Sequence, residues 1–230
     1  MPRKTAPPPF DALSALRECA FELFGRYGHD GVSIGDIAGA AGLSKGALYW
    51  HYRGKEALYL ECLQRLHTLF DQYIFAPMRA QNDPVRAVLQ LFAGLHRLQQ
   101  DPLVGKGIAG YWLIPKNPQS SALTQAQTRF EADSRAVIEQ TLARGAAAGA
   151  FDLHDDLEEF SRAVICLVEA VVLPLRRQSA DEVGRMLAVL ARTLFRAYAR
   201  DPATARTLVG NIADTASIHT RPLERQSAPD

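Results

Sequence analysis

The side chains best suited to chemistry gather in one short stretch of the chain, between residues 44 and 55. They carry hydroxyl, phenol, imidazole, ammonium and guanidinium groups: Ser44, Lys45, Tyr49, His51, Tyr52, Arg53 and Lys55. Hydrogen-bond donors and cations of these kinds bind the phosphate oxygens and base edges of nucleic acids. Because the formal net charge of the chain is only +1, such binding must come from this local cluster and not from bulk charge.

The spacing of small and apolar residues around the cluster is typical of a helix-turn-helix. In the segment DIAGAAGLSKGALYWHY, residues 36–52, Ala38 is small, Gly42 follows four residues later, and the apolar Leu48 follows six residues after that. A small residue lets the second helix cross closely over the first, and glycine adopts a turn conformation that a Cβ disfavours. Ser33 and Ser44 are placed to cap the two helices. The alternative is a plain helical corner that contacts no nucleic acid.

Elsewhere the sequence shows no arrangement typical of catalysis, metal binding or cofactor binding. Residues 105–110, GKGIAG, match the glycine spacing of a dinucleotide-binding loop, but neither a strand nor a βαβ pattern accompanies them. The histidines lack metal-ligand spacing, and the three widely separated cysteines indicate buried thiols of a reducing compartment. We therefore predict a protein that is not an enzyme, with no catalytic residue, no metal site and no cofactor.

Apolar residues recur at spacings of three and four over most of the chain, which predicts an all-α protein. Caps and breakers place the helices over about 11–27, 33–41, 44–52, 55–75, 84–100, 103–113, 121–148, 156–178 and 181–199. Pro77 is expected to end the fourth of these helices. We expect residues 1–10 to form a flexible arm and residues 201–230 a loose polar tail.

Two C-terminal helices carry more apolar surface than the core of one subunit requires. The stretch from Phe160 to Leu175 is apolar nearly all round, and Val183 to Tyr198 carries a broad apolar stripe. Helices that are apolar on more than one face cover something besides their own core. We therefore expect a homodimer. Its interface is assigned to Leu167, Val171, Val172, Leu187, Leu190 and Leu194.

The sequence favours a cytoplasmic protein that makes no contact with membranes. The N-terminus carries basic residues and prolines but no apolar region of the kind that signal peptides have. The longest apolar stretch, Ala163 to Leu175, is interrupted by Glu169 and Pro174. It is far shorter than the roughly 20 residues that span a bilayer.

At the helix-turn-helix the segment VSIGDIAGAAGLSKGALYWHYRGKEAL resembles the signature of TetR-family repressors. This resemblance covers roughly residues 11–60, and the piece LYWHY is similar to the multidrug-efflux members of the family. It implies a helix-turn-helix domain over 11–56 and a helical ligand-binding and dimerisation domain over 57–200, with the last two helices forming a four-helix interface. The positions that match the family's DNA contacts are Ser33, Lys45, Gly46, Tyr49, His51 and Lys55, to which the cluster adds Ser44 and Tyr52. Trp50 lies at a position where families vary.

The resemblance also implies a ligand pocket between the middle helices. The aromatic pair Tyr111 and Trp112, with Phe92, His96 and Phe130 on neighbouring helices, suits an apolar or amphipathic ligand. The alternative is that these residues are core. Glu169 needs a partner if it is buried, and either a ligand or an arginine such as Arg176 or Arg177 would supply one.

We therefore expect a dimeric repressor that binds a pseudo-palindromic double-stranded DNA operator and is released by a small-molecule effector. In such a protein the helix over 55–75, which both domains share, would transmit the effector's influence. The alternative is a DNA-binding protein of the same fold that is regulated by a protein partner.

Overall fold

The computed structural model describes residues 11–113, 121–153, 157–172 and 179–201, without the side chains of residues 169, 171 and 172. These residues are helical apart from turns, loops and one isolated β-bridge between Phe151 and Ala199. The all-α prediction is confirmed. None of the described helices is both long and apolar enough to cross a membrane. The expected arm at 1–10, the tail beyond residue 201, Arg176 and Arg177 lie outside the described residues.

Contacts between Cα atoms divide the chain into two compact units. The first unit takes residues 1–67 and 102–129, and the second takes residues 68–101 and 130–230. The expected domains, 11–56 and 57–200, follow sequence order instead. The difference arises because residues 102–113 pack against the first helix of the chain, about 80 residues earlier, as the bond between Arg26 and Lys106 shows.

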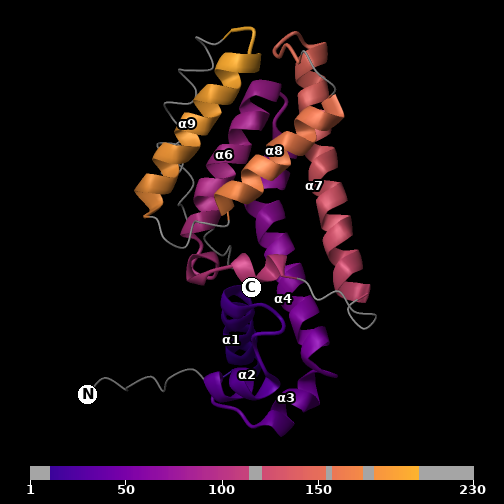
Figure 1. Ribbon diagram of the computed structural model, residues 1–230, viewed down its shortest axis with the longest axis vertical. Coiled ribbons are helices and arrows are strands. Elements are labelled where there is room, and N and C mark those ends of the chain that lie inside the picture. Colours follow the sequence, from indigo (N-terminus) through magenta and orange to yellow (C-terminus); the bar gives the residue numbers. More distant parts are fainter. Residues whose placement is uncertain (1–10, 114–120, 154–156, 173–178, 202–230) are drawn as a thin grey trace, which may run out of the picture. The chain divides into compact units, whose positions relative to one another are not determined.

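The first unit is built on α1 (Ala12–Tyr27), α2 (Ile34–Ala40), α3 (Lys45–His51) and most of α4 (Lys55–Phe70) (Figure 1). Local chemistry sets the ends of α1. The Asp11 carboxylate accepts hydrogen bonds from two amides of the first turn, and Gly28, with φ +73°, ends the helix. The buried apolar side chains of this unit include Leu16, Phe21, Phe24, Ile37, Leu48, Leu58, Tyr59 and Leu63.

Residues 103–113 do not form the expected helix. They make two short 3₁₀ turns, η2 (Val104–Lys106) and η3 (Ala109–Trp112), separated by Gly107 at φ +115°. Glycine costs about 1 kcal/mol per position in a helix, and this segment holds three of them. The turns pack on α1, so tertiary contact replaces the missing helical hydrogen bonds.

The expected helix over 55–75 changes character at Asp71. It becomes a π-helix, η1 (Asp71–Phe75), which runs directly into α5 (Ala76–Ala80), so the prediction that Pro77 ends this run is wrong. A proline ring clashes with the carbonyl four residues earlier in a regular α-helix. The wider π turn just before Pro77, together with its place in the first turn of α5, accommodates the ring.

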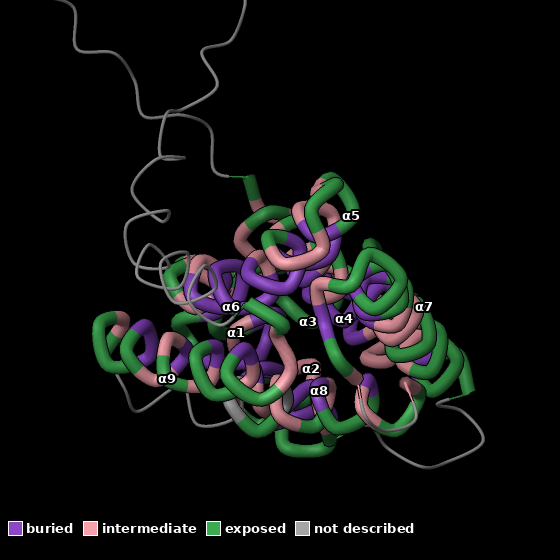
Figure 2. The backbone as a smooth tube through the Cα atoms, turned by 90° about the horizontal axis from the view of Figure 1, so that it is seen from above, coloured by how far each residue is buried: buried purple, intermediate pink, exposed green. Residues whose placement is uncertain are grey.

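The second unit contains α6 (Pro84–Gln100), the latter part of α7 (Ser121–Ala147), α8 (Leu157–Val172) and α9 (Ala180–Tyr198). Helix α9 begins with a capping box between Ser179 and Glu182, and it packs on α6. Buried and exposed residues alternate around α7 and α9 (Figure 2), as amphipathic helices require. The buried apolar side chains include Ile74, Met78, Leu91, Phe92, Leu98, Leu187 and Phe195.

Candidate nucleic-acid interface

The turn between α2 and α3 has the geometry that the sequence predicted. Gly42 takes φ +69°, a left-handed conformation that side chains disfavour. The amide of Leu43 donates to the carbonyl oxygen of Ala38 over 2.8 Å. Ala38 and Leu48 are 1% and 0% exposed, so the two helices meet on apolar surface. This packing fixes the direction of α3 relative to α2.

Both serines act as helix caps. The Ser33 hydroxyl accepts from the Asp36 amide over 3.1 Å, while the Asp36 carboxylate accepts from the Ser33 amide over 2.9 Å. Hydrogen bonding of the Asp36 carboxylate to the hydroxyl and the backbone amide of Ser33 holds the pKa of Asp36 below its usual value. The Ser44 hydroxyl accepts from the Ala47 amide over 3.2 Å. The DNA contacts assigned to the two serines stay predictions.

The outward face of α3 displays most of the polar cluster. Lys45, Gly46, Tyr49 and His51 are exposed, and the Tyr49 side chain reaches 57% exposure. Trp50 lies between two members of the cluster and is 85% exposed. Its ring meets the His51 ring edge-on, with 5.4 Å between the ring centroids. Their exposure leaves these side chains accessible to another molecule. A short helix of this kind, anchored by one buried leucine, can present its donors to a groove of DNA.

Tyr52 faces the interior instead. It is 8% exposed, its hydroxyl donates to Glu61 over 2.9 Å, and that hydroxyl accepts from Arg17 over 3.2 Å. Arg17 also pairs with Glu61 at 2.6 Å. Burial raises the pKa of Tyr52. In this structure Tyr52 therefore joins α1, α3 and α4, and its assignment to DNA contact stays a prediction. Glu61 and Arg17 carry no sequence signal that links them to Tyr52.

Lys55 is also engaged within the protein. Its ammonium group donates to the carbonyl oxygens of His29 and Val32, over 2.9 and 3.2 Å. These carbonyls belong to the loop between α1 and α2, so Lys55 holds that loop against the start of α4. An ammonium group has three donors, and the two bonds leave one for a phosphate. Direct contact with DNA stays a prediction.

Residues 104–113 hold α1 in place through hydrogen bonds and an ion pair. The Tyr111 hydroxyl donates to the carbonyl oxygen of Phe21 over 3.0 Å, and Arg26 donates to the carbonyl oxygen of Lys106 over 3.1 Å. Lys106 in turn pairs with Glu22 at 3.0 Å. This support was not predicted from the sequence. The glycines at 105, 107 and 110 were its only visible signal.

The predicted ligand residues fall in different surroundings. Phe92 lines a small cavity in the second unit, and the side chains that surround it within the described residues are all apolar: Met78, Val88, Leu91, Phe92, Ile138, Leu142, Val164 and Leu194. His96 is 6% exposed, and its Nε2 lies 3.1 Å from the carbonyl oxygen of Ala180. The Phe130 ring meets those of Phe70 and Phe75.

Tyr111 and Trp112 are not among the residues that line this cavity. Tyr111 is 1% exposed and lies in the core of the first unit between Phe21 and Tyr59, and Trp112 ends the adjoining 3₁₀ turn. The side chain of Glu169 lies outside the described residues. Their ligand roles stay predictions.

The predicted interface residues also differ in their surroundings. Leu187 is 0% exposed within the single chain, so its side chain packs inside the subunit and offers no surface to a partner. Leu167, Leu190 and Leu194 are half-buried. Val171 and Val172 lie in α8, but their side chains are outside the described residues. The assignment of a dimer interface to these helices stays a prediction.

Comparison with known proteins identifies the N-terminal part. Residues 16–62 match the family described as bacterial regulatory proteins, tetR family. The chain is 38% identical over 61 residues to the HTH-type transcriptional regulator AcrR of Shigella flexneri, which covers 26% of this chain and 28% of that protein. The match thus spans about a quarter of the length of this curated relative.

Solved structures share the fold over most of the chain. The TetR family protein CprB from Streptomyces coelicolor, in complex with its operator sequence, superimposes with a TM-score of 0.66 at 20% identity, covering 87% of this chain and 96% of that one. SmeT in complex with triclosan superimposes with a TM-score of 0.61 at 21% identity, covering 83% and 92%. These likenesses confirm the predicted fold, a helix-turn-helix followed by a helical domain.

Proposed function

This chain belongs to the TetR family of transcriptional regulators, and from that premise we propose that it is a cytoplasmic repressor that binds a pseudo-palindromic operator as a dimer. A small apolar or amphipathic effector releases it. The family is one of regulators and not of enzymes, in agreement with the prediction from the sequence. The observation that carries the proposal is the exposed face of α3, where Lys45, Tyr49 and His51 surround the buried Leu48.

In the proposed complex each α3 enters the major groove of DNA. Lys45, at the N-terminal end of α3, is placed to reach a base edge or a phosphate, while Tyr49 and His51 donate to phosphates. Two such helices in a dimer occupy successive major grooves roughly 34 Å apart. Bound at a promoter, the dimer excludes the transcription machinery.

The small cavity of the second unit supports release by an apolar effector. Its free volume is about 10 Å³, close to the space of a single water molecule. An effector therefore enters only if the surrounding side chains move apart. Effector binding then selects a conformation different from the one in this structure. When the effector and the operator DNA bind different conformations of the protein, the effector lowers the affinity for the operator. Helix α4 continues without a break into η1 and α5, which supports a role for this helix in transmission.

The most direct test of the proposed function begins by mixing the purified protein with fragments of the genome that encodes it. The DNA that stays bound to the protein is then identified. We expect one or a few inverted-repeat fragments, bound by two subunits. Neutral apolar compounds added to that complex should release the DNA, while charged compounds of similar size should not enter the apolar cavity. If no small molecule releases the DNA but a protein from the same cell does, regulation by a protein partner is favoured.

The dimer is tested separately through α9. Leu190→Glu places a charge on the half-buried face of this helix and should weaken dimerisation and operator binding together. Gln125→Glu, an exposed position on α7, adds the same charge and serves as the control. Light scattering that shows wild-type protein bound tightly to its operator as a monomer would contradict the proposed architecture.

A further inference from the structure

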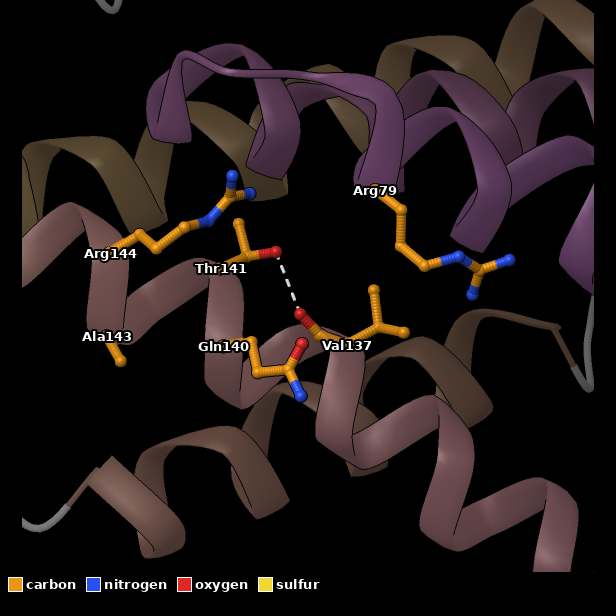
Figure 3. Close-up of a pocket in the computed structure, with 6 residues that line it drawn as sticks. All are labelled: Arg79, Val137, Gln140, Thr141, Ala143 and Arg144. Carbon is orange, nitrogen blue, oxygen red and sulfur yellow. Dashed lines mark hydrogen bonds between the residues drawn. The ribbon is translucent and has the colours of Figure 1, made fainter.

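A second cavity of the second unit, lined by residues of α5 and α7, has a different chemistry. Its volume is about 450 Å³, within the range of roughly 300–1,000 Å³ that small-molecule sites occupy. Figure 3 shows its lining, with one residue from α5 and five from the C-terminal half of α7: Arg79, Val137, Gln140, Thr141, Ala143 and Arg144. It shares no lining residue with the apolar cavity.

The charge of this second cavity is positive. Two guanidinium groups line it, and no carboxylate is among its lining residues in the described part of the chain. Asp71 pairs with Arg79 at 2.5 Å and offsets part of that charge. Arg144 donates from one nitrogen to the carbonyl oxygen of Gln81 over 3.2 Å. A guanidinium group has five N–H donors, so Arg144 retains donors for a ligand.

Part of the lining of the second cavity is apolar. Val137 is 8% exposed, and Ala143 adds a methyl group at the wall. The Thr141 hydroxyl donates its proton to the carbonyl oxygen of Val137 over 2.8 Å, which leaves its oxygen able only to accept. Donors for a ligand therefore come from Arg79, Arg144 and the Gln140 amide. A lining that combines cationic donors with apolar side chains matches a molecule with one anionic end and an apolar body.

We propose that the second cavity binds an amphipathic carboxylate, with its acid group at Arg144 and its apolar part over Val137 and Ala143. The guanidinium fork pairs with a carboxylate through two parallel hydrogen bonds, a geometry that an ammonium group does not reproduce. Arg79 adds positive charge without direct contact. This site lies outside the proposed effector cavity and does not depend on DNA binding.

Octanoate is the probe for this site, and isothermal titration calorimetry on the full chain is the measurement. We expect one octanoate per subunit, with affinity that falls as sodium chloride rises because exposed charges are screened. 1-Octanol and octylammonium, which have the same chain length, should bind this site at least tenfold more weakly. Absence of octanoate binding at millimolar concentration would overturn the proposal.

Variants locate the bound octanoate. Arg144→Gln removes a charge-assisted hydrogen bond and should raise the dissociation constant about tenfold or more, while Arg144→Lys should recover only part of that loss. The matched control is Arg135→Gln, on the same helix, where the arginine pairs with Glu139 outside the cavity. This control should bind octanoate within twofold of wild type.

Loss of the Arg144 bond to Gln81 also risks a change in folding, so a second variant keeps every polar group. Ala143 is exposed on α7, and Ala143→Phe fills the cavity without removing a contact. We expect this variant to unfold at the wild-type temperature and to lose octanoate binding. Wild-type octanoate affinity in both Ala143→Phe and Arg144→Gln would place the ligand elsewhere and overturn the proposal.

Discussion

Replacement of Gly25 by alanine is a sharp test of how the first unit is held together. A Cβ at Gly25 would lie 2.1 Å from the carbonyl oxygen of Gly107 and 3.3 Å from the Tyr111 ring. The first of these neighbours is backbone, so relief requires that residues 104–113 move away from α1 by more than 1 Å. That shift strains the Tyr111 hydrogen bond to Phe21 and the Arg26 bond to Lys106.

The expected magnitude follows from two opposing effects. Overpacking of a well-filled contact costs typically 1–3 kcal/mol. Alanine in a helix gains about 1 kcal/mol over glycine, which offsets part of the overpacking cost, so Gly25→Ala should destabilise the first unit by up to about 2 kcal/mol. Gly39 is the matched control, because it lies in α2 and a Cβ there meets nothing within 4 Å. Gly39→Ala should leave stability unchanged or raise it by up to about 1 kcal/mol.

Urea unfolding followed by tryptophan emission reports this difference, because both tryptophans of the chain belong to the first unit. All variants must be compared at one protein concentration, since the proposed dimerisation would make the midpoint depend on concentration. The Gly25→Ala midpoint should fall below that of wild type, and the Gly39→Ala midpoint should not. A Gly25→Ala protein as stable as the Gly39→Ala protein would refute the close contact between α1 and residues 104–113.

Three further predictions follow from single residues. The pKa of Asp36 is lowered by its two hydrogen bonds to the cap of α2, so its stabilising effect is present above its unfolded pKa of about 3.9 and is lost as pH falls through the lower folded value. Thermal unfolding should therefore show Asp36→Asn less stable than wild type at pH 6–7, with a difference that shrinks as pH falls below about 3.9; a difference that stays constant over this range would contradict this. Burial raises the pKa of Cys62 to about 12, so at pH 8 mass spectrometry should find this thiol labelled by a disulfide reagent only after unfolding, and rapid labelling of the native protein would show that it is accessible. Operator DNA should change the emission of the exposed Trp50, so the signal should persist in Trp112→Phe and vanish in Trp50→Phe, whereas the reverse pattern would place the DNA elsewhere.

Local sequence signals predicted the helix-turn-helix well, because they act within a few residues. The turn at Gly42, the caps at Ser33 and Ser44 and the burial of Leu48 depend on neighbours in the chain, and the structure shows each of them. Tyr52 was less predictable. Its partner Arg17 lies 35 residues away, and nothing in the sequence distinguishes a tyrosine that faces DNA from one that faces Arg17.

The same limit explains the differences at residues 103–113 and at Leu187. The glycine-containing segment has apolar residues at helical spacing, but its conformation follows from contacts with α1 that no local pattern encodes. Leu187 belongs to the apolar stripe of α9, and periodicity shows that a stripe is buried without showing what buries it. Here the subunit itself covers Leu187.

The measurement that tests the central claim most directly is operator affinity of a protein in which the exposed face of α3 has been removed. The triple variant Lys45→Ala, Tyr49→Ala, His51→Ala leaves the buried Leu48 and both caps in place, so α3 should still fold. Fluorescence anisotropy with the operator fragment that the protein binds from its genome should show affinity reduced at least a hundredfold. The slope of log affinity against log salt concentration should fall in magnitude by about one unit for the lost lysine. Arg86→Ala, which removes an exposed cation of α6 that pairs with Asp83, should bind as wild type does. Wild-type operator affinity in the folded triple variant would contradict the assignment of α3 as the helix that reads DNA.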